Sequence, residues 1–526
     1  MNTAVHPITG GDFERAGSAS KCLKEMLKKI GVEPETVRRT MIAAYEAEMN
    51  VVIHAHNGTM DIALDSDRLD VAVTDQGPGI PDIERAMQEG FSTAPPAVRQ
   101  LGLGAGMGLP NIRRHSDRFA IDSTVGEGTQ LRFTIFLASH EAHSATRSSV
   151  LVASPFCRQC LRCLHSCPTG ALRVRDGKPQ ILEHLCIDCT ACISACPSGA
   201  LTMDCTARPP QPSSDTVLVA PTSLLTQFGA EVHPQQVLEV LRDMGFADVR
   251  FLYEWEQALR DAVAEYAREE AESRPVISPL CPAVVNLIES RFPSLLPNVA
   301  PFLSPIEAAQ QALTATRVVV VVDCPAQQAA LVSNASDART TVMSPAGLCN
   351  EIAPLVMARK DAKDATLPCP DHANDAPHEA LHVSGISHVL RVLESMENGL
   401  LPDVPLLEMF ACDQGCPGSP VWKEDPFIAR RRWRVAGHER RPGVEAFRRD
   451  TPLLARAGLR LDADMSKAIA KLGEIAVLTK GLPGRDCGMC GAPTCAAMAE
   501  DVVLGRTDIE ACPYLPDSKG TPYEAE

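Results

Sequence analysis

The chain has 526 residues, of which 45% are apolar and 22% charged, and its formal net charge is −16. This length exceeds what one hydrophobic core accommodates, so we expect three to five domains. The acidic charge argues against nucleic acid as the main partner. Apolar runs such as "VVVVV" at 318–322 are too short to span a membrane.

The N-terminus, "MNTAVHPITGGDFERAG", lacks the charged start and the apolar stretch of a signal peptide. We therefore predict a cytoplasmic protein without a membrane span. Thiols stay reduced in that compartment. Of the twenty cysteines, those at motif spacing are accordingly expected to be metal ligands rather than disulfide partners.

The first 140 residues mix helix and strand patterns. "PETVRRTMIAAYEAEMNVVIHAH" predicts a helix that carries Glu46 and Asn50 four positions apart, on one face. "LDVAVTDQ" and "TQLRFTIFL" alternate as strands do. "GLGAGMGLPNI" is a glycine-rich loop that opens a helix, and "GEGT" leads into the last strand.

These fragments together indicate a nucleotide site. Asn50 can ligate Mg²⁺, Asp75 can accept a hydrogen bond from an adenine amino group, and the glycines of the loop let backbone N–H groups reach phosphates. Glu46 is placed to polarise a nucleophile and is the candidate catalytic residue. The candidate cofactor-binding residues are Asn50, Asp75, Gly77, Gly79, Gly104, Gly106, Gly108 and Thr129.

With "DQGPGIPDIERAM" and "GFSTA", this region resembles the histidine-kinase-like ATPases, and most closely their serine-kinase branch of anti-sigma factors and switch kinases. The resemblance implies an α/β sandwich that binds ATP or ADP with Mg²⁺. It also implies that Glu46 activates a serine of a protein phosphorylation target. A domain that binds nucleotide without transferring phosphate is the alternative, and both stay open.

"CRQCLRCLHSCP" (157–168) and "CIDCTACISACP" (186–197) repeat the pattern C-x2-C-x2-C-x3-C-P of bacterial two-cluster ferredoxins. In this pattern each 4Fe–4S cubane is held by three cysteines of one motif and the fourth cysteine of the other. Zinc is the alternative metal that the cysteines could bind. Cluster one would be held by Cys157, Cys160, Cys163 and Cys196. Cluster two would be held by Cys186, Cys189, Cys192 and Cys167.

The C-terminal fragment "DCGMCGAPTCAAMAEDVVLGRTDIEACPY" resembles the four-cysteine cluster domain found beside redox subunits of anaerobes. A zinc knuckle is the alternative. A helix after the third cysteine would carry the chain back to the fourth. The candidate ligands of this cubane are Cys487, Cys490, Cys495 and Cys512.

Three fragments between about 215 and 422 resemble, in order, the signatures of iron-only hydrogenases: "ISPLCPAVVNLIESRFPSLLPNVAPFLSP", "VVVVVDCPAQQ" and "EMFACDQGC". The resemblance implies a cubane, with the last cysteine bridging to a di-iron centre in that family. Four cysteines that bind nothing are the alternative. The matching positions are Cys281, Cys324, Cys412 and Cys416.

The rest of that family's catalytic apparatus is missing. Its proton-relay cysteine falls on Leu280, which cannot titrate. Its lysine that contacts the di-iron cyanide falls on Gln327, which carries no charge for an anionic ligand. Hydrogen turnover is therefore not expected, and we predict that Cys416 holds only the cubane.

The predicted architecture is multidomain α/β and α+β. It combines a kinase-like ATPase sandwich (1–140), a two-cluster ferredoxin (150–206), a two-lobed hydrogenase-like α/β domain (215–425) and a small helical Fe–S domain (451–526). Linkers are expected at 138–149 and 206–214, and an inserted loop at 363–380. The basic segment 429–449 is interpreted as a solvated connector or a docking strip for an acidic subunit, in preference to a nucleic-acid site. Four cysteines are left as plain thiols: Cys22, Cys205, Cys349 and Cys369.

We expect an ATP-binding, multi-cluster electron-transfer or redox-regulatory subunit with four 4Fe–4S clusters. Its partners would be redox subunits of a hydrogenase or NAD(H)-oxidoreductase complex. The alternatives are a structural electron-wiring component of such a complex, a serine kinase or anti-sigma-type redox sensor, an active or sensory iron-only hydrogenase, and an iron–sulfur assembly factor.

Overall fold

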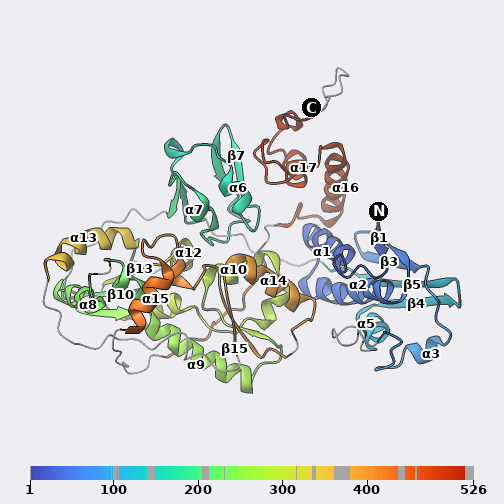
Figure 1. The fold of residues 1–526 in the computed structure, drawn as a ribbon, viewed down its shortest axis with the longest axis horizontal. Helices are drawn as coiled ribbons and strands as arrows, with labels where there is room; N and C mark the ends of the chain where they lie inside the picture. The colour runs from blue at the N-terminus through green and yellow to red at the C-terminus, as the bar shows by residue number, and fades with distance from the viewer. Residues whose placement is uncertain are drawn as a thin grey trace.

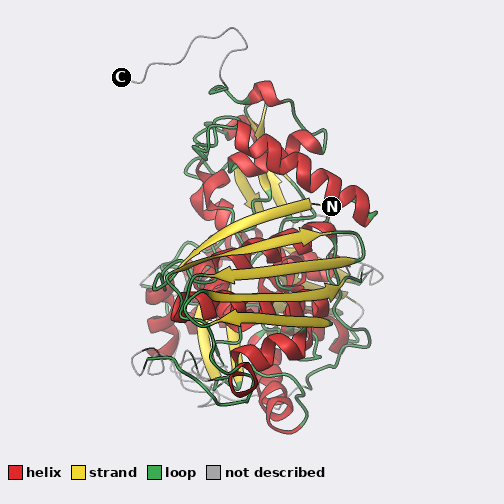
Figure 2. Ribbon diagram, turned by 90° about the vertical axis from the view of Figure 1, so that its right-hand side faces the viewer, coloured by secondary structure: helices red, strands yellow, loops and turns green. Residues whose placement is uncertain are grey.

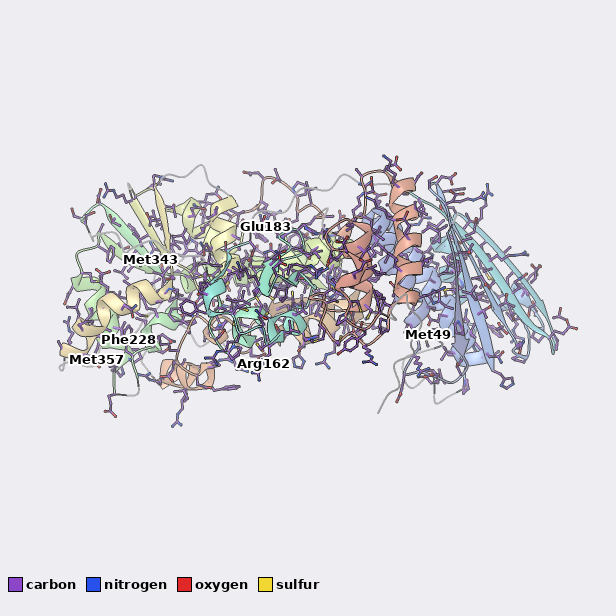
Figure 3. The ribbon with its side chains drawn as sticks, turned by 90° about the horizontal axis from the view of Figure 1, so that it is seen from above. Met49, Arg162, Glu183, Phe228, Met343 and Met357 are labelled. Atoms are coloured by element: carbon purple, nitrogen blue, oxygen red, sulfur yellow. The ribbon has the colours of Figure 1, made fainter. Side chains whose placement is uncertain are left out.

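The computed structural model describes residues 2–95, 98, 104, 106–138, 148–203, 213–229, 231–315, 317–333, 339–359, 380–401, 403–435, 445–456 and 459–515. The described parts form an elongated molecule (Figure 1). Seen from above, Met49 of the N-terminal domain lies toward one end and Met343 toward the other, with Arg162 and Glu183 between them (Figure 3). The predicted linkers and the inserted loop fall almost entirely outside the described residues.

The N-terminal domain is an antiparallel sheet with helices on one face (Figure 2). Alternate strand residues such as Met60, Ile62 and Val71 are buried in the core beneath these helices. The sheet order β1-β2-β3-β5-β4 joins Asn2–Thr9, Asn57–Leu64, Arg68–Asp75, Gly128–Phe136 and Arg118–Thr124. The helices are α1 (Ser18–Ile30), α2 (Pro34–His54), the short α3 (Ile83–Ala86) and α5 (Gly108–His115).

The two-motif domain repeats its backbone as it repeats its sequence. Gln159 and Leu161 have positive φ in the first motif, and Asp188 and Thr190 have positive φ at the same places in the second. A short helix follows in each case, α6 (Arg162–Ser166) and α7 (Ala191–Ala195). Two antiparallel pairs complete the domain: β6 (Val150–Val152) with β9 (Leu201–Met203), and β7 (Leu172–Arg175) with β8 (Lys178–Ile181).

The large α/β domain contains two parallel sheets, as a two-lobed fold requires. The first sheet has the order β11-β10-β13-β14, with bounds Asp248–Phe251, Thr216–Ala220, Arg317–Val321 and Thr340–Met343. The second has the order β12-β16-β15, with bounds Val276–Ile277, Leu406–Phe410 and Ala380–Ser384. The helices are α8 (Pro234–Asp243), α9 (Tyr253–Glu269), α10 (Pro282–Arg291), α11 (Pro305–Ala312), α12 (Pro325–Ser333), α13 (Pro345–Ala358), α14 (Ile386–Glu397) and α15 (Pro426–Val435).

The C-terminal part is helical, with α16 (Met465–Gly481) and α17 (Cys495–Val503). Its apolar side chains, such as Ile469 and Leu472, are buried in the same hydrophobic cluster as Leu23 and Leu27 of α1. The first and last segments of the chain therefore share one core. None of the described helices is long and apolar enough to cross a membrane.

The described part of the basic segment is not a solvated connector. Arg432 of α15 donates to the carbonyl of Thr226 at 2.9 Å, and Arg449 pairs with Glu307 at 2.8 Å. Arg448 pairs with Glu270 at 2.6 Å. Because these arginines find carboxylates and carbonyls of the large domain, the segment is fastened to that domain. Residues 436–444 lie outside the described part.

The C-terminal domain is attached to the two-motif domain through a fully buried carboxylate, Asp501 (0% exposed). Arg175 Nη2 lies 2.6 Å from its Oδ2, and Arg173 Nη2 lies 3.1 Å from its Oδ1. Removing one member of a buried ion pair leaves an uncompensated charge and costs about 3–5 kcal/mol.

We therefore predict that Asp501→Ala loosens the joint between these two domains. Hydrogen exchange should increase in segments 172–175 and 487–503 by the equivalent of about 3 kcal/mol. Glu510→Ala, which removes an exposed carboxylate of the same domain, serves as the control. Equal exchange in the two variants would contradict the role assigned to Asp501.

Candidate functional site

The nucleotide residues of α2 meet the start of α5. Asn111 of α5 donates to Glu46 Oε1 at 2.9 Å. A Cβ atom at Gly108 would lie 3.2 Å from Asn50 Oδ1 and 3.3 Å from Glu46 Oε2, so glycine leaves the space beside both side chains. Asn50 Nδ2 is buried and has no hydrogen-bond partner among the described residues. Unpartnered buried groups are rare, and this one fits a site that a ligand completes.

Asp75 ends β3 and faces the turn that follows it. Its Oδ1 accepts hydrogen bonds from the N–H groups of Gly77 at 2.8 Å and Thr129 at 3.3 Å. Burial raises the pKa of Asp75, against the lowering effect of these two hydrogen bonds. The carboxylate is thus positioned by two of the residues that the sequence predicted, and it has a second oxygen for a ligand.

Three of the predicted glycines adopt backbone conformations that would be strained in residues with a side chain. Gly79, Gly104 and Gly106 all have positive φ. A Cβ atom at Gly106 would lie 2.5 Å from the carbonyl carbon of Gly90 and 2.7 Å from the Phe91 nitrogen. The loop therefore passes close to 90–91, and its N–H groups are brought toward the start of α5. Most of residues 96–105 lie outside the described part.

The thiols of the two ferredoxin motifs gather in two groups. Burial raises the pKa of Cys163, and the thiols that add to this are Cys196, Cys157 and Cys160. Burial also raises the pKa of Cys189, and the thiols that add to this are Cys167, Cys192 and Cys186. Each group draws its fourth member from the other motif, as in the crossed ligand sets predicted from the spacing.

The four cysteines of the large domain line one cavity between its two lobes. Cys281 follows β12, Cys324 follows β13, and Cys412 and Cys416 follow β16. All four positions lie beyond the carboxyl ends of parallel strands, where open α/β sheets place their ligands. Residues Asp188, Cys189 and Thr190 of the second ferredoxin motif complete the wall of this cavity.

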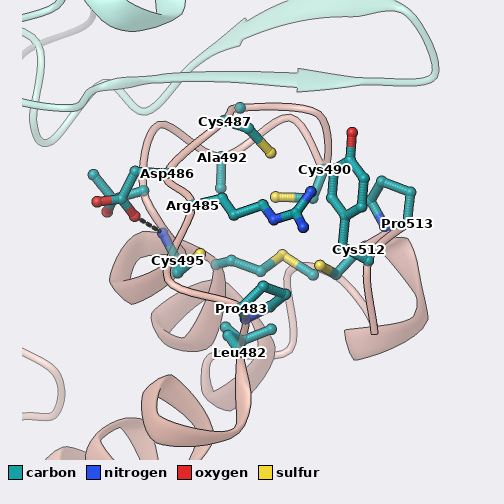
Figure 4. Close-up of a pocket in the computed structure, with 14 residues that line it drawn as sticks. Leu482, Pro483, Arg485, Asp486, Cys487, Cys490, Ala492, Cys495, Cys512 and Pro513 are labelled. Atoms are coloured by element: carbon teal, nitrogen blue, oxygen red, sulfur yellow. Dashed lines mark hydrogen bonds between the residues drawn. The ribbon is translucent and has the colours of Figure 1, made fainter. Parts of the chain in front are cut away.

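The C-terminal cysteines Cys487, Cys490, Cys495 and Cys512 line a separate cavity, with their sulfur atoms turned toward a common space (Figure 4). The Asp486 carboxylate accepts a hydrogen bond of 2.6 Å from the Cys495 nitrogen. The Arg485 guanidinium lies over the Tyr514 ring, 4.7 Å from its centroid. Helix α17 begins at Cys495 and returns the chain toward Cys512, as the sequence predicted.

These thiol groups have the donor set of 4Fe–4S clusters. Each contains four cysteines, and the two ferredoxin groups come from C-x2-C-x2-C-x3-C-P motifs, whose spacing is that of cubane-binding loops. Burial raises the pKa of Cys324 and Cys416 well above the ordinary value, so ionised thiols there require a bound metal charge. The residues therefore fit iron–sulfur clusters.

Leu280 and Gln327 stand where the hydrogenase-like resemblance places the relay cysteine and the lysine, and both side chains contact groups that serve neither role. Leu280 is buried in an apolar cluster with Val263 and Phe302. Gln327 Oε1 accepts a hydrogen bond of 2.7 Å from the Asp323 nitrogen, and its Nε2 lies 3.4 Å from Asp323 Oδ2. Neither side chain offers a proton relay or a positive charge.

Asn111 and Thr190 contribute to these sites but were not predicted. Asn111 stands inside the glycine-rich fragment, four residues after Met107, and its position at the start of a helix could have indicated a role. Thr190 lies at a non-cysteine position of a ferredoxin motif. Nothing in the local pattern shows that it meets another domain.

Four family models match the chain. They are the histidine kinase-like ATPase domain at 11–135, the 4Fe-4S dicluster domain at 156–201, the iron only hydrogenase large subunit, C-terminal domain at 215–336, and a putative Fe-S cluster at 482–514. The hydrogenase match ends before Cys412 and Cys416. The assignment of those two cysteines therefore depends on the third motif and on the geometry of the cavity.

Serine/threonine-protein kinase RsbT of Bacillus subtilis is 36% identical over 113 residues, which cover 21% of this chain and 79% of that protein. An anti-sigma F factor of Thermoanaerobacter is 32% identical over 110 residues, which cover 20% of this chain and 73% of that protein. A solved FeFe-hydrogenase from Chlamydomonas reinhardtii is 15% identical and covers 42% of this chain and 83% of that chain, with a TM-score of 0.33.

The fold and the sites define a protein in which a nucleotide-binding domain is fused to iron–sulfur domains. Through residues 11–135 the chain belongs to the histidine kinase-like ATPase family, in the branch of serine/threonine kinase RsbT and the anti-sigma F factors. A dicluster ferredoxin, a hydrogenase-like domain and a C-terminal Fe–S domain follow.

Glu46→Gln should separate phosphate transfer from nucleotide binding. Loss of a general base lowers rates by about 10²–10⁴-fold, so ADP release from ATP should fall by at least 10²-fold while ATP affinity changes little. Asp75→Asn, which removes the carboxylate predicted to accept the adenine amino group, should instead weaken binding. If Glu46→Gln releases ADP as fast as the unaltered protein, Glu46 is not catalytic.

Proposed function

We propose that this chain is a nucleotide-binding electron relay in which four 4Fe–4S clusters form one path, and in which the nucleotide site is mechanically linked to the end of that path. The observation that supports it is the contact between successive cysteine sites. The clusters would be held by the four cysteine sets described above. Reduction potentials would be set by burial and by hydrogen bonds to sulfur.

The first contact joins the C-terminal site to the ferredoxin domain. The Val174 nitrogen donates to the Gly491 carbonyl at 2.8 Å, and Arg175 donates to the Cys490 carbonyl at 2.6 Å. A Cβ atom at Gly488 would lie 2.9 Å from His165 Nε2. The loop that carries Cys487 and Cys490 thus packs on the first ferredoxin motif.

The second contact joins the ferredoxin domain to the hydrogenase-like site. The Thr190 hydroxyl lies 3.7 Å from Cys412 Sγ, and Cys189 is part of the wall around the four hydrogenase-like cysteines. Arg456 fastens this joint, because it donates to the Cys186 carbonyl at 3.0 Å and pairs with Glu289 at 2.9 Å. Ligands of two clusters are therefore separated by a single residue.

The nucleotide site is linked to the same end of the path through two helices. Glu48 lies on α2 between Glu46 and Asn50, and it accepts hydrogen bonds from the N–H groups of Gly17, Ala19 and Ser20 at 2.9–3.1 Å. It thereby holds the N-terminal end of α1, where a negative charge is favourable.

The other parts of this link lie at the two ends of α14. Lys24 and Lys28 of α1 are buried against Glu397, the last residue of α14. At the opposite end, the nitrogen of Gly385, which precedes α14, donates to the carbonyls of Phe410 at 3.0 Å and Cys412 at 3.3 Å. One helix therefore connects the cysteine loop with the ATPase domain, and Figure 1 shows α14 beside α1 and α2.

The relay predicts a magnetic interaction between neighbouring clusters. The anaerobic protein should contain roughly sixteen irons, and its dithionite-reduced EPR spectrum should show split signals. Cys324→Ser should remove about four irons and simplify the ferredoxin signals. Cys349→Ser changes a half-buried cysteine of the same domain and should leave both unchanged. Ferredoxin signals that are identical in the two variants would rule out close contact between the clusters.

The mechanical link predicts that cluster oxidation state changes nucleotide affinity. Coupling between sites is typically 5–150-fold, so the Kd for ADP should differ by about that factor between the oxidised and reduced protein. Glu397→Gln should abolish the difference. Glu394 lies on α14, the same helix as Glu397, and forms a more exposed 3.1 Å pair with Lys21 of α1. Glu394→Gln breaks this pair and should preserve the difference in affinity. Equal affinities in the two redox states of the unaltered protein would contradict the link but not the relay.

A further inference from the structure

The hydrogenase-like domain contains a second cavity, of about 300 Å³, next to its cysteine site. It lies at the carboxyl ends of β10, β13, β15 and β16, and Cys416 lines both cavities. Cavities of this size hold small-molecule ligands. A molecule bound here would therefore contact the ligand shell of the cluster directly.

Glu408 is the polar group of this cavity whose bonding is incomplete. Its side chain is 1% exposed. Arg260 Nε and His382 Nδ1 both lie 3.2 Å from the same oxygen, Oε2. The other oxygen, Oε1, is buried and has no hydrogen-bond partner among the described residues. Although burial opposes it, His382 and Arg260 hold the pKa of Glu408 below its ordinary value. An ionised acceptor is thus left open at the cavity.

Glu256 supplies a second carboxyl group to the same cavity from α9. The positive groups of the wall are already engaged, because Arg260 contacts Glu408 and Arg430 donates to Gln414 at 2.9 Å. The hydroxyl groups of Thr222 and Thr226 and the ring of Phe410 line other parts of the wall. Burial, with the neighbouring charge of Glu408, raises the pKa of Glu256 against the lowering effect of Arg260, so a cation bound beside it would favour its ionised form. The carboxyl oxygens of Glu408 and Glu256 are therefore the acceptors that a ligand with N–H groups would meet.

This lining does not suit an anionic metal centre. Gln327, the counterpart of the lysine that contacts cyanide in the hydrogenases, is turned to Asp323 and does not line the cavity. Leu280, the counterpart of the relay cysteine, does not line it either. Carboxylates that face an anion repel it, whereas they bind N–H donors with charge-assisted hydrogen bonds.

We propose that this cavity binds a small organic cation of the amidinium or ammonium class, held by Glu408 and Glu256 beside Cys416. The proposed site extends the relay, because it places a bound small molecule beside the last cluster of the path. Binding of the cation does not depend on electron transfer, since occupancy can be measured in the oxidised protein. Binding next to Cys416 would also change the electrostatic surroundings of the adjacent cubane.

Three planar probes of nearly equal size test the proposal: acetamidinium, acetamide and acetate. Titration calorimetry on the full, oxidised protein should show acetamidinium binding at least tenfold more tightly than acetate, with acetamide between them. Saturating acetamidinium should also shift the EPR signal of the reduced cubane at Cys416. The EPR shift is lost if no cubane is bound at Cys416, as it would be if the relay proposal were wrong. The calorimetric result does not depend on the cubane.

Glu256→Gln should weaken acetamidinium binding at least tenfold, and Glu408→Gln should do the same. Glu408→Gln also leaves the buried Arg260 without its carboxylate and could therefore destabilise the protein. If Glu408→Gln folds poorly, Glu256→Gln decides the outcome. Glu265→Gln, an exposed position of the same helix, is the matched control and should bind normally. Binding of acetate as tight as that of acetamidinium, no binding of any probe, or infrared bands of CO and CN ligands would each overturn the proposal.

Discussion

The burial of Glu397 between two lysines is the contact on which the arrangement of the domains depends. Burial lowers the pKa of Lys24 to about 8 and lowers that of Lys28 further below its ordinary value. The lysine ammonium groups also lie over the Phe292 ring, 5.3 and 5.1 Å from its centroid. Charges taken out of water cost several kcal/mol unless they are paired. Docking of the ATPase domain on the hydrogenase-like domain is therefore tolerated only because Glu397 pairs with both lysines, and removing this carboxylate would leave two buried lysines without it.

A second constraint is the density of buried thiols. Cys189, Cys281 and Cys416 are buried deeply enough that their pKa values lie above the ordinary range of a free thiol. Such residues form a stable core either as neutral thiols or as metal-bound thiolates. Metal binding and folding are then coupled. Because the ferredoxin sets cross between motifs and Cys189 borders the next site, cluster assembly would fix several joints of the molecule at once.

The sequence predicted those parts of the sites that are local in the chain. Cysteine spacing defines each ligand loop, and a helix places Glu46 and Asn50 on one face whatever surrounds it. Contacts between distant segments left no such signal. The hydrogen bond from Asn111 to Glu46 and the approach of Thr190 to Cys412 depend on how helices and domains pack.

The apolar pattern of α16 shows the same limit. It predicts that one face of the helix is buried, and it does not say that the partner is α1, more than 430 residues earlier in the chain. The described part of the basic segment shows the limit again. Its charge density favoured a solvated connector or a docking strip for an acidic subunit, but the carboxylates that pair with Arg448 and Arg449 are Glu270, directly after α9, and Glu307 of α11, far away in the sequence.

The shared core of the first and last segments has a consequence for oxidative damage. Cys487 of the C-terminal site is exposed, whereas Ile469, Leu472 and Ile475 of the same segment are packed with α1. Loss of an oxygen-sensitive cluster at Cys487 would loosen the cysteine loop that holds α16 and α17 together. The apolar face of α1 that packs against α16 would then be exposed to solvent. Oxidative damage at a surface metal site would therefore destabilise the ATPase domain, in addition to interrupting electron transfer.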